Sequence, residues 1–175
     1  AEAGAALPAS CRLGTCGSCH ASVTDGPYEL GGPQGAFGLH ETGLRPRWFV
    51  AGGTGLAPLL AMVRRMAEWQ DPQPARLLLG VNEPQDVFGL DELASVAAEL
   101  PGFRYDICVR RPGPDRSGPT GTPADLLAAA LPELGTTTPD LYVCGPPPLV
   151  DAVLRTAALA GVPSDQIHRE RFLAT

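Results

Sequence analysis

The chain has 175 residues, of which 44% are hydrophobic and 18% are charged, and its formal net charge is −6. This length and composition are typical of one medium globular domain with an appendage. The acidic balance argues against nucleic acid or an anionic membrane as the main partner, and no apolar run approaches the ~20 residues that span a bilayer. We therefore expect a cytoplasmic protein with neither kind of partner.

Residues 1–46 are rich in glycine, cysteine, proline and small polar residues, and they show little periodicity. Three of the five cysteines of the chain lie here, at Cys11, Cys16 and Cys19. An odd number of clustered cysteines is atypical of a secreted disulfide scaffold and indicates a metal ion or a metal cluster. We expect this region to pack less well than the rest of the chain.

The spacing Cys11-x4-Cys16-x2-Cys19 is that of plant-type [2Fe–2S] loops, which need a fourth, distant cysteine. The glycines between these cysteines favour this interpretation, because a tight loop around a cluster needs small residues so that backbone N–H groups can point at sulfur. A zinc site formed by the three cysteines and His20 is the alternative. In either case the three cysteines are the candidate metal ligands.

Five short apolar runs alternate with four helical patterns over the rest of the chain, which predicts a βαβ arrangement. Because the runs are continuous rather than alternating, both faces of the sheet should carry helices. We therefore expect the α/β class and a five-stranded, parallel, doubly wound sheet. The expected strands are 47–51, 76–81, 103–109, 140–144 and 166–172. The expected helices are about 59–69, 90–100, 123–131 and 149–159.

The first expected strand ends in a glycine-rich turn, Gly52-Gly53-Thr54-Gly55, which is followed by Pro58. In a parallel sheet, ligands bind beyond the carboxyl ends of the strands. Glycines let the backbone approach a ligand closely, and the next helix directs unpaired N–H groups and a positive dipole end at a pyrophosphate. Pro58 suits the first helical turn but occupies the third glycine position of the G-x-G-x-x-G fingerprint. A tight strand–helix turn without a ligand is the alternative interpretation.

The fourth expected strand ends in a second distinctive turn, Cys144-Gly145-Pro146. A buried cysteine after a strand is commonly just a small apolar residue. The place of Cys144 at the carboxyl end of a strand, directly before a helix, leaves a binding or catalytic role equally open. This turn is therefore the second candidate for the ligand site.

Residues 49–58 and 142–146 together resemble the nucleotide-binding module of the ferredoxin–NADP reductase superfamily. Residues 32–37 resemble the segment that closes the flavin-binding barrel just before that module. Residues 7–19 resemble the ferredoxin module at the N-terminus of oxygenase reductases such as those of benzoate dioxygenase and soluble methane monooxygenase. The resemblance therefore implies an oxygenase-type reductase with an N-terminal ferredoxin-like segment.

The resemblance also implies roles for individual residues. The pyrophosphate of a dinucleotide would lie against the turn from Gly53 to Gly55, and Cys144 would be the catalytic residue beside the nicotinamide. Phe172 would be the C-terminal aromatic residue that faces the flavin ring. The full expected cofactor-binding set is Gly52, Gly53, Thr54, Gly55, Pro58, Glu83, Asp86, Cys144, Gly145, Pro146 and Phe172.

In this family the nicotinamide passes a hydride to a flavin, which releases single electrons to the [2Fe–2S] cluster and from there to an oxygenase. The resemblance thus implies NADH, FAD and a [2Fe–2S] cluster as cofactors, with an oxygenase component as the electron acceptor. The expected function is that of an NADH-dependent electron-transfer reductase component. The alternative is a nucleotide-binding module without catalysis, whose cysteine loop is vestigial or binds a metal.

Parts of the family pattern are absent from this sequence. We assign residues 1–30 to a partial ferredoxin-like segment, 31–46 to the end of the flavin barrel with a linker, and 47–175 to the reductase domain. The flavin-binding R-x-Y-S motif does not occur, and neither Cys108 nor Cys144 occupies the place of the fourth cluster ligand. We therefore expect a chain in which two ends of a longer reductase are joined and most of the flavin barrel is missing.

The choice between NADH and NADPH depends on residues after the second and third expected strands. Glu83 and Asp86 are acidic, and carboxylates favour a ribose 2′-hydroxyl over a 2′-phosphate. Against this, Arg110, Arg111 and Arg116 follow the third strand and could bind a phosphate, unless they only form a solvated loop. NADH is the predicted cofactor, and NADPH is the alternative.

Overall fold

The structure is a computed structural model that describes residues 37–40, 43–114 and 117–171. Several expectations concern residues outside these ranges, and nothing in the structure bears on them. They involve Cys11, Cys16, Cys19, Arg116, Phe172 and the ferredoxin-like segment 1–30.

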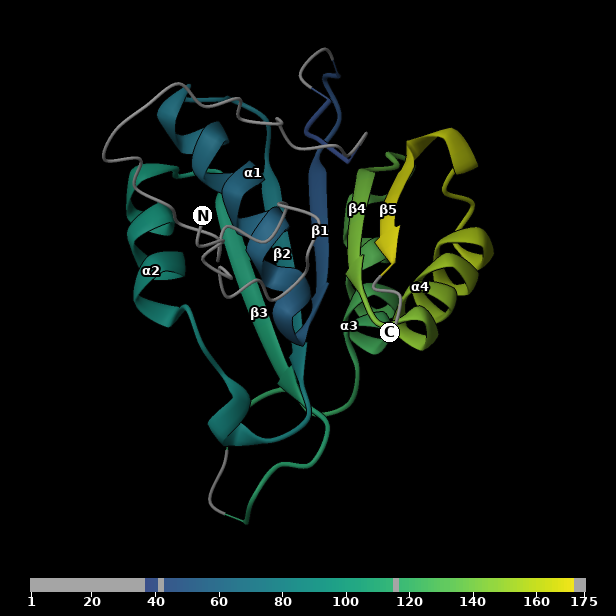
Figure 1. Cartoon of the computed structure of the whole chain (residues 1–175). Coiled ribbons are helices and arrows are strands. Elements are labelled where there is room, and N and C mark those ends of the chain that lie inside the picture. Colours follow the sequence, from purple (N-terminus) through teal and green to yellow (C-terminus); the bar gives the residue numbers. More distant parts are fainter. Residues whose placement is uncertain (1–36, 41–42, 115–116, 172–175) are drawn as a thin grey trace, which may run out of the picture.

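Five parallel strands form one sheet, and four α-helices flank it, within the described residues (Figure 1). The strands are β1 (Arg47–Gly52), β2 (Ala75–Val81), β3 (Phe103–Val109), β4 (Asp140–Gly145) and β5 (Ile167–Arg171). The helices are α1 (Leu56–Glu68), α2 (Leu90–Glu99), α3 (Pro123–Ala130) and α4 (Pro147–Leu159). Each expected strand and helix is present, so the predicted α/β class is confirmed.

The order of the strands in the sheet is β3-β2-β1-β4-β5, so the chain changes sides between β3 and β4. All neighbouring strands are parallel, and Ala51 of β1 lies opposite Leu79 of β2 and opposite Cys144 of β4. The carboxyl ends of the strands therefore lie along one edge. Ligands of open α/β sheets bind outside that edge where the strand order reverses, which here is between β1 and β4.

Helices α1 and α2 cover one face of the sheet, and α3 and α4 cover the other (Figure 1). Phe49 and Tyr142 belong to the core under α1 and α2, whereas Val50 and Val143 belong to the core under α3 and α4. Successive side chains of a strand point to opposite faces, so a strand covered on both faces must be apolar throughout. This arrangement explains the continuous apolar runs in the sequence.

Helix α4 begins at Pro147, slightly before the expected start at Leu149. Proline is well suited to the first helical position, because its missing N–H has no partner there and its fixed φ is already helical. The two leading prolines carry no periodic apolar signal, so the sequence pattern alone places the start too late.

No helix in the described ranges is long and apolar enough to cross a membrane.

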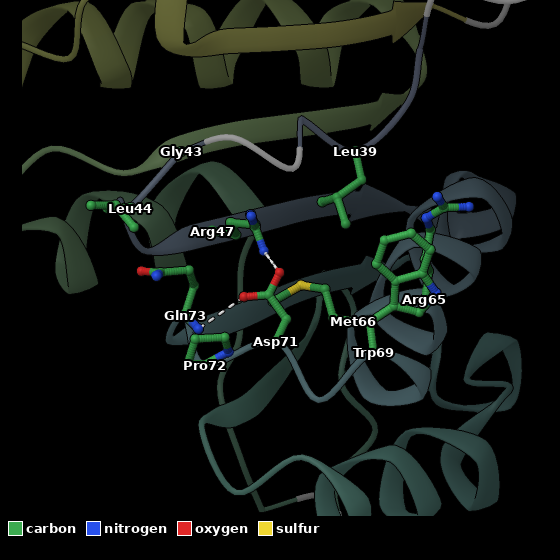
Figure 2. A pocket seen from close by; sticks show the side chains of 10 residues that line it. All are labelled: Leu39, Gly43, Leu44, Arg47, Arg65, Met66, Trp69, Asp71, Pro72 and Gln73. Carbon is green, nitrogen blue, oxygen red and sulfur yellow. Dashed lines mark hydrogen bonds and ion pairs between the residues drawn. The ribbon is translucent and has the colours of Figure 1, made fainter.

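Arg47 fixes the amino end of β1, at the edge opposite the candidate ligand edge. Its side chain is only 1% exposed and forms an ion pair with Asp71, which follows α1 (Figure 2). Asp71 also accepts a hydrogen bond from the backbone N–H of Gln73 at 3.0 Å. The Nη2 atom of Arg47 donates to the carbonyl oxygen of His40 at 3.3 Å. The arginine therefore joins β1, the loop after α1 and the segment that precedes β1.

A small pocket of about 330 Å³ lies beside this ion pair. Leu39 and Leu44 from the segment before β1, and Trp69 from the end of α1, contribute apolar walls (Figure 2). Phe37 and Leu39 are also partly buried against the core under α1 and α2. The expectation that residues 1–46 pack less well than the rest stays a prediction, because only residues 37–40 and 43–46 of this region are described.

Candidate functional site

The turns after β1 and β4 touch each other at the carboxyl edge of the sheet. Gly55 lies so close to β4 that a Cβ atom at this position would be 2.1 Å from the carbonyl oxygen of Cys144. A Cβ atom at Gly145 would be 3.2 Å from the backbone nitrogen of Gly52. These approaches favour glycine, which has no Cβ. The two turns singled out in the sequence therefore form one site.

The helix that follows the first turn offers a place for an anion. Helix α1 has no side-chain cap, and its first turn contains no acidic residue. The N–H of its first residue, Leu56, donates to the carbonyl oxygens of Gly53 and Thr54, so the turn Gly53–Gly55 and the positive end of the helix dipole face the carboxyl edge. Helix α4 differs, because Pro147 and Pro148 at its first positions have no N–H. The arrangement thus favours an anionic group at α1 over one at α4.

A pocket of about 800 Å³ opens beside these turns. Gly52, Gly53 and Thr54 line it from the β1 side, and Pro146 lines it from the β4 side. Gly53 has a φ of +54°, in the left-handed region, and no atom lies within 4 Å of the place where its Cβ would be. A ligand could therefore approach the backbone directly, and the volume lies in the range of cofactor sites.

Four of the expected cofactor-binding residues are buried and do not line this pocket, namely Gly55, Pro58, Cys144 and Gly145. Gly55 is buried against β4, and Pro58 is buried in the first turn of α1. In this structure Gly55 permits the contact between the two turns, and Pro58 supports the start of the helix.

The ends of β2 and β3 supply the far wall of the pocket, which includes Asp86 and Arg110. Asp86 accepts a hydrogen bond from the backbone N–H of Glu83 at 3.0 Å, which fixes the orientation of its carboxylate. Glu83 does not line the pocket, and its carboxylate pairs with Arg111 at 2.8 Å. Of the two expected carboxylates, only Asp86 therefore lies on the pocket wall.

Sequence reasoning missed Glu170, which lies beside Cys144. The two residues are opposite each other on β4 and β5. The thiol of Cys144 is fully buried and donates to a carboxylate oxygen of Glu170 at 3.9 Å. The strand register is the signal that could have found this pair, because parallel pairing of Leu141 with Ile167 also brings residues 144 and 170 together. Glu170 therefore lies beside the turn after β4, although neither it nor Cys144 lines the pocket.

Sequence reasoning also missed Phe88, which lines the pocket between β2 and α2. Its side chain is 43% exposed, which is unusual for a large apolar residue unless it forms part of a binding surface. Phe88 directly precedes Gly89, which is the N-cap residue of α2 and has a left-handed φ of +73°. An aromatic residue at this place offers a planar surface for a ring.

The described residues contain no group of three or more cysteine, histidine, aspartate or glutamate side chains that could hold a metal ion. Cys108 is fully buried in β3, and its thiol contacts the carbonyl oxygen of Leu79 at 3.6 Å. A cluster held by another segment could not reach this thiol without opening the sheet. The structure is therefore consistent with the expectation that Cys108 is not a cluster ligand.

Comparison with known proteins identifies two family matches. The model described as the oxidoreductase NAD-binding domain matches residues 49–155. The model described as the 2Fe-2S iron-sulfur cluster binding domain matches residues 1–44. The first match contains the sheet up to α4 and both glycine turns, and the second contains the three clustered cysteines.

Several relatives are reductases of oxygenase systems. The toluate 1,2-dioxygenase electron transfer component of Pseudomonas putida is 37% identical over 147 residues, which cover 83% of this chain and 42% of that protein. The propane 2-monooxygenase reductase component of Rhodococcus jostii (strain RHA1) is 34% identical over 148 residues, which cover 82% of this chain and 40% of that protein. The chain thus spans less than half the length of these relatives.

Among solved structures, the cytochrome P450 reductase GcoB of Amycolatopsis is similar in both fold and sequence. The TM-score is 0.73 at 31% identity, and the match covers 81% of this chain and 42% of that chain. This similarity agrees with the sheet order and helix arrangement described above.

Replacing Gly55 by alanine should lower the free energy of unfolding by about 3 kcal/mol, because the new Cβ would force the turn away from the Cys144 carbonyl. Gly113→Ala is the matched control, since no atom lies within 4 Å of its Cβ position. Urea unfolding of both variants measures the difference. A Gly55→Ala variant as stable as the control would contradict the close passage of the two turns.

Proposed function

Because the chain belongs to the oxidoreductase NAD-binding domain family, we propose that it is the nicotinamide-binding, electron-transfer part of an oxygenase reductase. The matches confirm the resemblance to oxygenase reductases and the presence of NAD-binding and 2Fe-2S domains. When bound, the nicotinamide would supply a hydride. Flavin and a [2Fe–2S] cluster would then pass its two electrons on one at a time. The proposed acceptor is an oxygenase component, as in the relatives named above.

One observation carries the proposal for the nucleotide. The two glycine turns meet at the point where the strand order reverses, and Gly53 and Thr54, which lead into α1, line the pocket of about 800 Å³. Backbone N–H groups at a helix N-terminus bind phosphate groups without a side chain. The residues present therefore suit a pyrophosphate, which would bind at Gly53 and Thr54.

The shape of the pocket supports an orientation for the dinucleotide. The pocket is lined by Pro146 beside β4, by Gly53 and Thr54 before α1, and by Phe88 and Asp86 beside β2. A pyrophosphate at α1 would direct one half of the dinucleotide toward each end. We assign the nicotinamide half to the β4 side and the adenosine half to the β2 side, where Phe88 offers a surface for a ring.

At the β4 end, Cys144 and Glu170 are the groups available to act on the nicotinamide side. Cys144 is fully buried, whereas Glu170 is half-buried at the sheet edge. The thiol donates to the carboxylate, so it holds Glu170 in place. We therefore propose Cys144 as a positioning residue that acts through Glu170, in place of the direct catalytic role expected from the sequence.

At the β2 end, the charge of Asp86 supports NADH as the cofactor. A 2′-phosphate near Asp86 would meet a like charge whose position is fixed by the Glu83 N–H. Arg110 lines the same wall and would favour a phosphate. Arg111 is less available for that role, because it pairs with Glu83. The carboxylate that faces the pocket therefore favours a free ribose hydroxyl.

Replacing Gly53 by valine should weaken NADH binding by about tenfold or more, because the side chain would occupy the space where the backbone meets the pyrophosphate. Gly161→Val is the matched control. Gly161 also has a positive φ, +76°, and open space around its Cβ position, but it follows α4 away from the pocket. Isothermal titration calorimetry measures both. Equal NADH affinities in the two variants would place the nucleotide elsewhere.

The chain should bind NADH about tenfold more tightly than NADPH, and Asp86→Asn should remove most of this preference. Asparagine can still accept the hydrogen bond from the Glu83 N–H, so the turn should remain intact while the charge is lost. Asp91→Asn, in the first turn of α2 outside the pocket lining, is the control. Calorimetry with NADH and with NADPH gives the ratio of the two affinities for the unmodified chain and for each variant. Tighter binding of NADPH by the unmodified chain would overturn this assignment.

The electron-transfer role itself is tested by NADH-dependent reduction of ferricyanide, with FAD, iron and sulfide supplied under anaerobic conditions. Glu170→Gln should lower kcat by about tenfold with little change in KM, because the carboxylate would act on the reacting end and not on the pyrophosphate. Glu99→Gln at the end of α2 is the control. A chain that binds NADH tightly but reduces no ferricyanide would support the alternative of a non-catalytic nucleotide-binding module.

A further inference from the structure

The segment before β1 is held on the sheet by the backbone of His40. The N–H of His40 donates to the hydroxyl oxygen of Tyr142 in β4 at 3.0 Å. Its carbonyl oxygen accepts from Nη2 of the buried Arg47 at 3.3 Å. Both backbone groups of His40 therefore have partners in the sheet, although its side chain is exposed. His40 lies near the end of the 2Fe-2S model match, residues 1–44, and in the segment 31–46 that leads into the reductase domain.

The ring of His40 completes a stack of four aromatic rings across the sheet. It stacks on His168 of β5, with ring centroids 4.1 Å apart and planes inclined by 24°. His168 stacks on Tyr142 of β4 at 4.9 Å, and Tyr142 stacks on Phe49 of β1 at 5.2 Å. The inner pair is buried in the core, whereas the outer pair consists of two imidazoles in direct contact. The segment is thus attached to the edge strand through two titratable rings.

We propose that the His40–His168 stack is a proton-sensitive latch that holds the segment before β1 on the nucleotide-binding sheet. Two neutral imidazoles stack well, but two protonated ones 4.1 Å apart repel each other. Burial and the neighbouring His40 ring disfavour a proton on His168 while the stack is closed, whereas release exposes the His168 ring to water, where it can take up a proton. Acidification through the range in which histidine titrates therefore shifts the segment toward release. This inference does not depend on which nucleotide the chain binds.

The charged groups around the stack do not remove this repulsion. Burial and the neighbouring His40 lower the pKa of His168, while the carboxylates of Asp140 and Asp165 raise it by a smaller amount. Asp140 is itself paired with Arg45 at 3.3 Å, which weakens its attraction for a proton on the imidazole. The net direction is downward, so the closed latch favours neutral His168.

The groups on the other elements that face the stack are the Tyr142 hydroxyl and the Arg47–Asp71 ion pair. The Tyr142 hydroxyl is neutral, because burial raises its pKa. Arg47 and Asp71 form a buried ion pair on the far side of the His40 backbone. The direction of the pH effect on the latch follows from the lowered pKa of His168. Because its pKa is lowered in the closed state, the latch is at full strength above the ordinary histidine pKa, about 6.5, and weakens as the pH falls below it.

The experiment is a pH titration of the full chain by NMR, which follows the NOE between the His40 and His168 rings. The NOE between Phe49 and Tyr142 serves as the internal reference, since this pair is in the core and contains no histidine. The His40–His168 NOE, relative to this reference, should fall by roughly fivefold between about pH 7.5 and pH 5. A constant reference NOE shows that the fold persists.

The variant His40→Phe keeps an aromatic ring but cannot be protonated. The variant removes the repulsion between two imidazole rings but keeps the burial of His168, so at about pH 5 the contact between the new ring and His168 should weaken less than the original ring contact does. Tyr142→Phe removes the acceptor of the His40 N–H and should weaken the ring contact at all pH values without moving the midpoint. An unchanged NOE in the original chain at pH 5 would overturn the proposal. The proposal would also be overturned if the NOE between the ring at position 40 and His168 fell equally at about pH 5 in the original chain and in His40→Phe.

Discussion

The contact between the turn after β1 and the end of β4 is the constraint on which the candidate site depends. A Cβ atom at Gly55 would lie 2.1 Å from the Cys144 carbonyl oxygen, so any side chain there would push β4 away from α1. Because the turns can meet, the start of α1 lies beside the reversal in strand order. The helix N-terminus, the open backbone at Gly53 and the pocket all follow from this one approach of two backbones.

The carboxyl edge and the amino edge of the sheet have different roles. The carboxyl edge is built from glycine turns and exposes backbone groups, which suits the binding of a phosphate-containing ligand. The amino edge is built from the buried Arg47, whose partners fix the loop after α1 and the segment before β1. The segment that leads from the 2Fe-2S match is thereby attached at a distance from the pocket, on the same sheet that forms it.

The sheet and both glycine turns could be predicted from the sequence, because continuous apolar runs and glycine-rich strand ends are local signals. Glu170 and Phe88 could not be predicted in the same way. Glu170 depends on the register between β4 and β5, and Phe88 depends on how the loop before α2 folds over the pocket. Glu83 shows the opposite case, since its sequence position suggested a ligand contact but its carboxylate pairs with Arg111. The latch at His40 joins residues more than a hundred positions apart, which no local pattern records.

The most direct test of the account is a crystal structure of the chain with NAD⁺ bound. We expect the pyrophosphate to accept hydrogen bonds from backbone N–H groups between Gly53 and the first turn of α1. We also expect the nicotinamide on the side of Pro146 and the adenine on the side of Phe88. A pyrophosphate bound away from the start of α1, or a dinucleotide in the reverse orientation, would contradict this account.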